Sequence, residues 1–275
     1  MKMNKKTLSI IMAVEAALIA CACIGLGGLF LYNGGLAGNN SAPAVQPEGA
    51  VIPENPAESA TETAIPEPTP RLDNTTIEKL PEGATRYLDQ SAGFELIVPA
   101  GWLAVRPNSD EFNAAFAESA STNQMLKDQM AADQANYDPN FDRLYAYILH
   151  PEIQEGVMFG MSKLAWDVDD NTPLDNKTLG ELLRGLESSG AIPGFRANFS
   201  SIIENGRGIP IIVIKGRFAM DDGQGGAVPF STTLIVFKPT PTSVARITFS
   251  FLQDFEDTIS TDIDALIESI TIFTP

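Results

Sequence analysis

The chain has 275 residues, of which 44% are hydrophobic and 19% are charged, a composition typical of a globular protein. Its formal net charge of −17 argues against nucleic acid as a partner, because phosphate binding requires clustered Lys and Arg, and it disfavours an anionic membrane surface for the same reason. Both cysteines, Cys21 and Cys23, lie near the N-terminus, so the rest of the chain has no disulfide framework and no cysteine-based zinc site.

A long apolar run near the N-terminus, residues 7–32, predicts a transmembrane helix. At 1.5 Å per residue such a helix is roughly 39 Å long, enough to cross a bilayer with some tilt. Glu15 is its single charge, and the apolar residues outweigh the insertion cost of about 3 kcal/mol. We expect an uncleaved signal anchor.

The distribution of positive charge predicts the orientation of this helix. Lys2, Lys5 and Lys6 precede it, and no Lys or Arg follows it until Arg71. By the positive-inside rule, residues 1–6 stay in the cytoplasm and the remainder is exported. The sequence therefore predicts a single-pass protein of the cell membrane with its C-terminal part outside.

An alternative for the same segment is a bacterial lipoprotein signal. Leu18 to Cys21, "LIAC", has lipobox spacing and would make Cys21 a lipidated N-terminus. However, "CIGLGGLFLY" continues the apolar run, whereas lipoproteins usually turn polar after the cysteine, and signal peptides have a shorter apolar core. Both alternatives place the same part of the chain outside.

Residues 33–75 are predicted to be a disordered stalk. Within them, residues 39–70 contain seven prolines and five glutamates, with no aromatic and no basic residue. Such a segment cannot bury enough apolar surface to offset its ordering entropy. Pro-rich linkers favour extended polyproline conformations, so a stalk is favoured over a PxxP-type ligand for a partner domain.

From residue 76 to residue 275 the composition becomes globular, and apolar alternation predicts a series of strands separated by two helical stretches and followed by a third. The strands lie within 85–105, 144–150, 157–166, 199–205, 209–218, 229–239 and 243–252. The helices are expected at about 110–134, at 179–188 and at 260–270. The glycine-rich Asp221–Gly226 is expected to be a hairpin loop, because it lies between two strands and lacks the Lys of a phosphate loop.

Capping residues support the three helices. Ser109 is a plausible N-cap for the first, Thr178 and Glu181 form a capping box for the second, and Thr261 is a cap for the last. Strands in runs with helices between them predict an α+β domain. We expect an antiparallel sheet flanked by helices, a three-layer α/β/α sandwich, preceded by the transmembrane helix and the disordered Pro-rich linker.

The stretch "YLDQSAGFELIVPAGW" resembles the start of the PsbP and Mog1-like fold family, where a Tyr-x-Asp strand leads to a Gly-Phe strand that ends in Pro-x-Gly-Trp. The pattern is carried here by Tyr87, Asp89, Gly93, Phe94, Pro99, Gly101 and Trp102. The resemblance covers roughly residues 86–273. It implies an antiparallel sheet between helix layers and a non-enzymatic role in binding or assembling other proteins. The helix at 110–134 is not part of the family core.

Pro99 and Trp102 also have a plain physical interpretation. Proline ends a strand because it removes a ladder donor. Tryptophan then buries a large apolar area, and its N–H needs a partner. We expect Trp102 in the core, with a binding surface as the alternative.

No convergent catalytic set is evident in the sequence. His150 is the only histidine, it precedes Pro151, and it is expected in a solvent-exposed loop. A hydrolase would have to use it with a serine, yet no GxSxG occurs, and the sequence around Ser162 is not SxxK. We therefore expect no enzyme activity and no cofactor, and we keep a hydrolase using His150 as an alternative.

The segment "DVDDNTPLD" raises the possibility of calcium binding. Asp167, Asp169, Asn171 and Asp175 occupy EF-hand-like positions, but position 6 is not Gly and position 12 is not Glu. A second set, Asp138, Asn140 and Asp142, has even fewer supporting residues. Because acidic surface loops are expected in so acidic a chain, we predict no metal site. The partner is expected to be an unidentified protein or small ligand at the cell envelope.

Overall fold

The computed structural model describes residues 74–188, 192–221 and 226–274. The predicted transmembrane helix at 7–32, Cys21 and nearly all of the predicted stalk lie outside these residues. Within the described ranges, none of the helices has the length and apolar character needed to cross a membrane.

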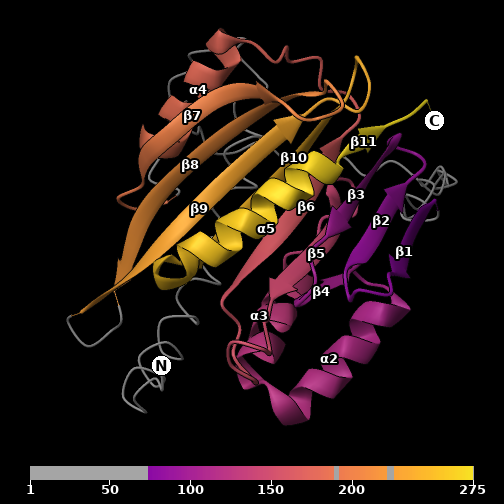
Figure 1. The fold of residues 1–275 in the computed structure, drawn as a ribbon, viewed down its shortest axis with the longest axis vertical. Coiled ribbons are helices and arrows are strands. Elements are labelled where there is room, and N and C mark those ends of the chain that lie inside the picture. The colour runs from indigo at the N-terminus through magenta and orange to yellow at the C-terminus, as the bar shows by residue number, and fades with distance from the viewer. Residues whose placement is uncertain (1–73, 189–191, 222–225, 275) are drawn as a thin grey trace, which may run out of the picture.

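The described chain forms two antiparallel sheets and four α-helices (Figure 1). The small sheet has the order β1-β2-β3-β11 and the large sheet the order β4-β5-β6-β10-β9-β8-β7. The strands are β1 (Thr75–Lys79), β2 (Thr85–Asp89), β3 (Phe94–Val98), β4 (Trp102–Val105), β5 (Asp142–Ile148), β6 (Gly160–Asp167), β7 (Arg196–Glu204), β8 (Pro210–Asp221), β9 (Ala227–Phe237), β10 (Val244–Leu252) and β11 (Thr271–Ile272). The helices are α2 (Asp110–Thr122), α3 (Gln124–Ala135), α4 (Asn176–Ser188) and α5 (Glu256–Ser269), and a short 3-10 turn, η1 (Gln253–Phe255), precedes α5.

The two faces of the large sheet are covered by different elements. One hydrophobic cluster joins this sheet to α5 and to the small sheet, and a second joins its other face to α2, α3 and α4. Figure 1 shows α5 crossing the large sheet beside the small one. The α+β class and the antiparallel pairing predicted from sequence are therefore confirmed, whereas the division of the strands into two sheets was not predicted.

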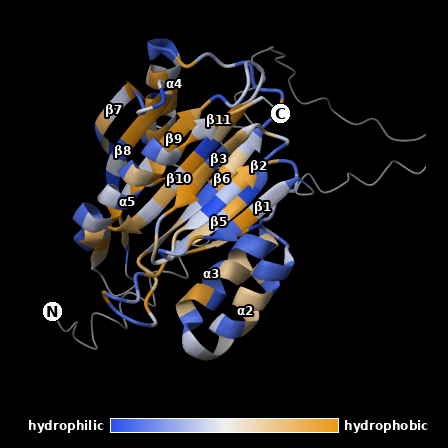
Figure 2. Ribbon diagram, turned by 45° about the vertical axis from the view of Figure 1, so that its right-hand side comes forward, coloured by the Kyte–Doolittle hydropathy of each residue, from blue (hydrophilic) through white to orange (hydrophobic). Residues whose placement is uncertain are grey.

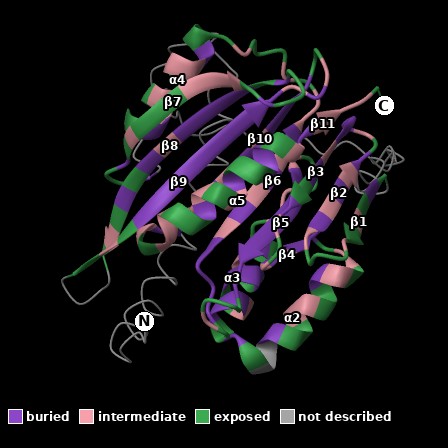
Figure 3. Cartoon of the chain, in the orientation of Figure 1, coloured by how far each residue is buried: buried purple, intermediate pink, exposed green. Residues whose placement is uncertain are grey.

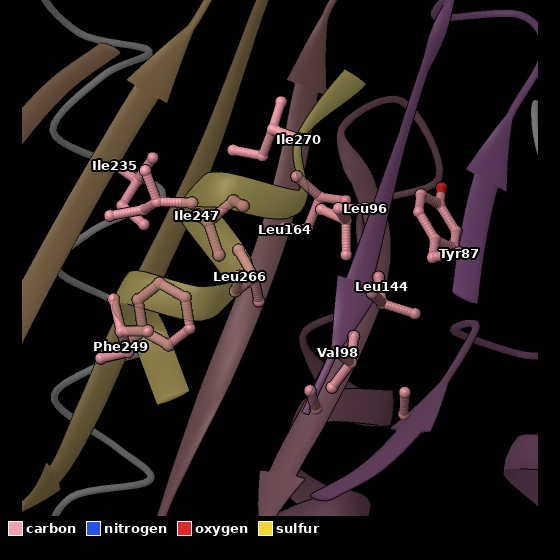
Figure 4. Close-up of a cluster of buried hydrophobic side chains, with 14 of the residues drawn as sticks. Tyr87, Leu96, Val98, Leu144, Leu164, Ile235, Ile247, Phe249, Leu266 and Ile270 are labelled. Carbon is pink, nitrogen blue, oxygen red and sulfur yellow. The ribbon is translucent and has the colours of Figure 1, made fainter. Parts of the chain in front are cut away.

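Alternating side chains build the first cluster. Phe94, Leu96 and Val98 of β3 are buried, while Glu95 and Ile97 between them are more exposed. Figure 4 shows residues from β2 and β3 facing those of β5, β6, β9, β10 and α5. Since the cluster draws on strands and a helix from both ends of the described chain, the start and the end of the domain share one core.

Burial differs along the large sheet (Figure 3). Most of β9 is buried, because it lies between two other strands and under helices on both faces. The edge strand β7 is mostly exposed, and its Phe199 is 45% exposed. Figure 2 shows many hydrophobic residues along the strands of the large sheet and mixed residues along α2.

The predicted helix at 110–134 is two helices, and Asn123 separates them. Its backbone is extended, with φ −148° and ψ 91°, and its N–H donates to the carbonyl of Ser119 at the end of α2. Its side chain accepts from the N–H of Leu126 at the start of α3. Asn123 thus caps both helices, which a continuous helix could not do. The predicted N-cap at Ser109 is confirmed, because its hydroxyl accepts from Phe112 N–H.

Two predicted caps are wrong. The N–H of Thr178 donates to the carboxylate of Asp175, so Asp175 caps α4 and Thr178 lies inside the helix. Thr261 lies in the second turn of α5, where its hydroxyl donates to the carbonyl of Asp257. In both cases the helix begins earlier than the predicted cap. The hairpin predicted around Asp221–Gly226 is confirmed, because Asp221 and Ala227 are opposite each other in the β8–β9 pairing.

Candidate functional site

The segment Pro99–Gly101 carries the chain from the small sheet to the large one, since β3 ends at Val98 and β4 begins at Trp102. Gly101 has φ +81°, a conformation that favours glycine. Its carbonyl accepts hydrogen bonds from Leu149 N–H at 3.1 Å and His150 N–H at 2.8 Å. A Cβ on Gly101 would lie 2.8 Å from Nδ1 of His150. The glycine of the "PAGW" motif therefore makes room for the only histidine of the chain.

His150 is the centre of a compact polar cluster. Its Nε2 lies 2.8 Å from Oδ2 of Asp262, and its Nδ1 lies 2.5 Å from Oε1 of Glu152. The indole N–H of Trp102 donates to the same Asp262 oxygen at 3.0 Å. We call Trp102, His150, Glu152 and Asp262 the histidine cluster; it joins β4, the loop after β5 and helix α5.

The structure corrects the prediction of an exposed His150. The residue is only 5% exposed, although it lies in the loop that follows β5 and precedes a proline. The reason is that Asp262 on α5, which is 112 positions later in the chain, and Trp102 on β4 close over the imidazole ring. Its backbone also has φ +37°, a strained conformation for a non-glycine residue that persists because the surrounding contacts hold it.

The chemistry available to His150 follows from these contacts. Each ring nitrogen faces a carboxylate, and Nε2 also accepts the indole N–H of Trp102 at 3.3 Å, so which nitrogen donates depends on the tautomer of the ring. The hydrogen bond from His150 lowers the pKa of Glu152 below its ordinary value.

The Tyr-x-Asp part of the motif builds a second cluster between the sheets. Tyr87, Asp89 and Arg143 are all fully buried, and the hydroxyl of Tyr87 donates to Asp89 at 3.2 Å. Nε of Arg143 lies 3.7 Å from the Asp89 carboxylate, and its guanidinium lies 4.6 Å from the centre of the Trp166 ring. Burial raises the pKa of Asp89 and raises that of Tyr87 well above its ordinary value.

Arg143 reaches this position through an irregularity in β5. The pairing of β5 with β6 shifts register between Asp142 and Leu144, so Arg143 is an extra residue in its strand. Such bulges redirect side chains. Because the carboxylate of Asp89 also accepts from Ala92 N–H at 2.9 Å, it both shapes the turn before Gly93 and lies beside the cation from the large sheet. We interpret this cluster as a structural junction.

A third polar cluster lies under α3. Asp133 is 3% exposed, and its carboxylate accepts from the Tyr147 hydroxyl at 2.8 Å and from the Gln129 amide at 3.0 Å. Asp142 is 2% exposed; it accepts from the Tyr145 hydroxyl at 2.7 Å and pairs with Lys163 at 2.8 Å. Burial raises the pKa of Asp133 to about 6. These groups fix α3 on the sheet.

The raised pKa of Asp133 predicts a dependence of stability on pH. The folded state holds this proton more tightly than the unfolded chain, whose value is near 3.8. Its contribution to stability is therefore complete below pH 3.8 and is lost as pH rises through about 6. A shift of roughly 2 pKa units corresponds to about 3 kcal/mol.

Asp133→Asn keeps a side-chain acceptor but removes the buried charge. We expect the difference in free energy of unfolding between Asp133→Asn and the wild type to shift in favour of the variant by about 2–3 kcal/mol as pH rises from 4 to 7.5. Urea unfolding at each pH measures this difference. Asp128→Asn makes the same charge change on the exposed side of α3, and its difference from the wild type is expected to stay nearly constant. A constant difference for Asp133→Asn as well would contradict the assignment.

The calcium candidates are engaged in other contacts. Asp167 accepts from the N–H of Asp169 in a local turn, and Asp175 caps α4. Asp170, which lies between them, pairs with Arg246 of β10. Within the described ranges, no group of three or more His, Cys, Asp or Glu side chains could hold a metal ion.

The acidic residues of the second calcium candidate, Asp138 and Asp142, are also engaged in contacts within the protein. Asp138 accepts from the N–H of Asn140, and Asp142 accepts from the N–H of Asp138 besides pairing with Lys163. Asp142 therefore belongs to the cluster under α3 and not to a loop that could surround a cation.

Sequence reasoning missed Asp262, Arg143 and Asp133. Asp262 is one of several acidic residues of α5, and nothing in the sequence connects it to His150. A signal did exist for Arg143 and Asp133, because charged residues inside otherwise apolar or helical stretches are often buried with a partner. The identity of the partner, however, is a property of the fold.

No protein-family model and no curated protein matches the chain. Its fold is similar to the solution structure of cyanobacterial PsbP (CyanoP) from Synechocystis, with 11% identity and a TM-score of 0.42 over 70% of this chain and 94% of that one. It is also similar to LpqN of Mycobacterium tuberculosis, described as involved in cell envelope biogenesis, with 15% identity and a TM-score of 0.36 over 72% and 90% of the chains. A PsbP structure is thus among the solved structures whose fold is similar to that of this chain.

Proposed function

We propose that this chain is a single-pass membrane protein whose domain lies outside the cytoplasm and binds another protein there without catalysing a reaction. In this proposal, residues 7–32 are the anchor and residues 33–75 are the stalk that carries the domain away from the bilayer. The charge asymmetry around the apolar run supports the orientation.

The proposal that the domain does not catalyse a reaction is supported by the environment of His150. Both of its ring nitrogens face carboxylates at 2.5 and 2.8 Å. A hydrolytic triad needs one nitrogen to accept a proton from a nucleophile while the other donates to a carboxylate. Among the described residues, the ring nitrogens of His150 contact Glu152, Asp262 and the indole N–H of Trp102, none of which is a hydroxyl or thiol nucleophile.

The charge of the domain suggests the chemistry of the partner. Residues 74–275 contain 28 acidic and 14 basic residues, a net charge of −14. Large apolar side chains at Ile97, Ile153 and Phe199 are exposed among polar neighbours. Complementary potentials steer association, so a partner with a basic surface fits this domain best.

The topology can be tested with intact cells. We expect protease added outside to remove the domain from the full-length chain and to leave a small membrane-bound fragment. Degradation of the domain only after lysis would contradict the orientation. Cys21→Ser tests the lipoprotein alternative: loss of fatty-acid labelling and release from the membrane would show that Cys21, and not an uncleaved helix, anchors the protein.

Two other functions remain as alternatives. A hydrolase would depend on His150, so a His150→Gln variant that folds with wild-type stability but loses a measured activity would favour an enzyme. A purely structural envelope component would depend on the stalk, so shortening residues 39–70 would impair it while point changes on the domain surface would not.

A further inference from the structure

Strand β7 forms an open edge of the large sheet. It stands at the end of the strand order, and among the described residues no further strand pairs with its outer side. None of its nine residues is buried. At its start, the N–H of Ala197 donates to Glu187 of α4 at 3.2 Å, and the pairing with β8 shifts register between Ala197 and Phe199. The regular open stretch therefore runs from Phe199 to Glu204.

The other edges of the two sheets are short or charged, as is usual for edge strands. β4 has four residues and β11 has two. β1 has five residues, and Glu78 and Lys79 among them are charged. In contrast, the stretch from Phe199 to Ile203 has no charged side chain, and Phe199 is 45% exposed. Such an edge is a site where another strand can pair.

The apolar face of α4 is only partly covered by this edge. Four leucines recur at helical spacing along it: Leu179, Leu182, Leu183 and Leu186. Only Leu186 is buried, whereas the other three are half-buried against the core. The comparable apolar stripe of α5 has four buried residues. Figure 3 shows α4 and β7 mainly as intermediate and exposed residues, beside the buried β9. Because α4 packs on the last strand of the sheet, its leucine face lacks a complete cover within the described ranges.

The charges of α4 and β7 balance, unlike those of the whole domain. The two elements contain three acidic and three basic residues: Glu181, Glu187, Glu204, Lys177, Arg184 and Arg196. The domain as a whole has a net charge of −14. Two copies of so acidic a domain therefore repel each other least where these elements meet.

The order of the charges along α4 is complementary to itself. From the start of the helix the order is Lys177, Glu181, Arg184 and Glu187, so basic and acidic residues alternate. A second α4 that runs in the opposite direction brings its Arg184 beside Glu181 and its Glu187 beside Lys177. Each of these contacts occurs twice across a two-fold axis.

The same rotation reverses β7 and matches its apolar residues. Phe199, Ser201 and Ile203 lie opposite Lys215, Val213 and Ile211 of β8, so they share one face of the sheet. In an antiparallel pairing centred on Ser201, Phe199 lies opposite Ile203 of the second copy, again twice. Pairs of an aromatic and a β-branched residue are favourable cross-strand neighbours.

We propose that β7 and α4 form a two-fold symmetric interface between two copies of this chain. β7 pairs with β7 of the second copy and extends the large sheet across the dimer. α4 packs along α4 of the second copy and covers the half-buried leucines. A two-fold interface requires a surface that is complementary to itself, which the charge order of α4 and the residues of β7 provide. The dimer does not depend on the proposed function, because Ile97 and Ile153 lie on other elements.

The first test measures the mass of the full-length chain in density-matched detergent micelles by sedimentation equilibrium. We expect the wild type to be a dimer. Ser200→Lys places two lysines close to the two-fold axis, and lysine on an edge strand hinders pairing, so the dissociation constant should rise at least about tenfold. Thr76→Lys makes the same kind of change at an exposed position of the edge strand β1, and it should leave the dimer intact.

Charge reversal tests the helix contact. Glu181→Lys or Arg184→Glu alone brings like charges together at two symmetry-related contacts, so each should weaken the dimer about tenfold. The double variant restores opposite charges in exchanged positions and should recover the wild-type dissociation constant. Urea unfolding checks that every variant remains folded.

Three results would overturn the proposal. The first is a monomeric wild type, and protection of the β7 amides from hydrogen exchange in that monomer would assign the edge to another segment of the same chain. The second is a dimer that Ser200→Lys leaves unchanged, which would place the contact elsewhere, for example in the predicted transmembrane helix. The third is a double charge reversal that fails to restore the dimer.

Discussion

Trp102→Ala is expected to lower the free energy of unfolding by about 3–5 kcal/mol. The indole is only 3% exposed and packs edge-on against Phe249, with ring centres 5.9 Å apart. Its removal leaves a cavity between β4 and β10 and takes a hydrogen-bond donor from Asp262. Denaturant unfolding of a soluble chain that begins near Thr76 would measure the loss.

Leu266→Ala is the companion variant for that measurement. Leu266 lies on α5, is 3% exposed, and belongs to the same hydrophobic cluster as Trp102, so we expect a loss of about 2–5 kcal/mol in the same single transition. Two transitions, each moved by only one variant, would mean that the chain has two folding units. Wild-type stability of Trp102→Ala, together with lost binding, would place Trp102 at a recognition surface.

Arg143→Met is expected to cost about 3–5 kcal/mol, because it leaves the carboxylate of Asp89 buried without its cation. Both side chains are fully buried, and the guanidinium also stacks over Trp166. The loss should be larger at high pH, because burial already raises the pKa of Asp89 and protonation at low pH removes its charge.

A double-mutant cycle with Asp89→Asn separates charge from packing. If the buried charge causes the loss, adding Asp89→Asn to Arg143→Met should recover a large part of it, so that the double variant is more stable than the sum of the single changes predicts. Additive losses would show instead that Arg143 acts only through its packing against Trp166.

The strands of this domain were predictable because their alternation of apolar and polar residues is local. Phe94, Leu96 and Val98 in β3, and Ala245, Ile247 and Phe249 in β10, place every second side chain in a common core. The hairpin from β8 to β9 was predictable for the same reason. The break between α2 and α3 at Asn123 could also have been predicted, since Asn is a favoured N-cap. The apolar residues on both sides of Asn123 instead suggested one continuous helix.

The histidine cluster could not be predicted from the sequence. The two carboxylates that bind His150 are 2 and 112 positions away, and only the docking of α5 beside β4 brings Asp262 to the ring. A His-Pro pair at the end of a strand is typical of an exposed loop. The left-handed backbone of His150 and the missing side chain of Gly101 are what allow the ring to turn inward.

The division of the strands into two sheets could not be predicted from the sequence either. Strand periodicity indicates which face of a strand is buried, but it does not indicate which strands pair. The sequence indicates that a strand ends at Pro99, but not that Pro99–Gly101 is the crossover from the small sheet to the large one. The pairing of β11 with β3 joins the two ends of the described chain and leaves no local trace in the sequence.

The central claim, that the domain binds a protein outside the cell membrane, is tested most directly by site-specific photo-cross-linking in intact cells that make the full-length chain. Ile97, Ile153 and Phe199 are 38, 43 and 45% exposed and offer positions for the cross-linking group on three separate elements. We predict that at least one position gives a discrete adduct with a single protein, in a yield that falls as salt is raised, because the acidic domain attracts a basic surface. The absence of an adduct at all three positions, together with loss of a hydrolytic activity in a stably folded His150→Gln variant, would contradict the claim.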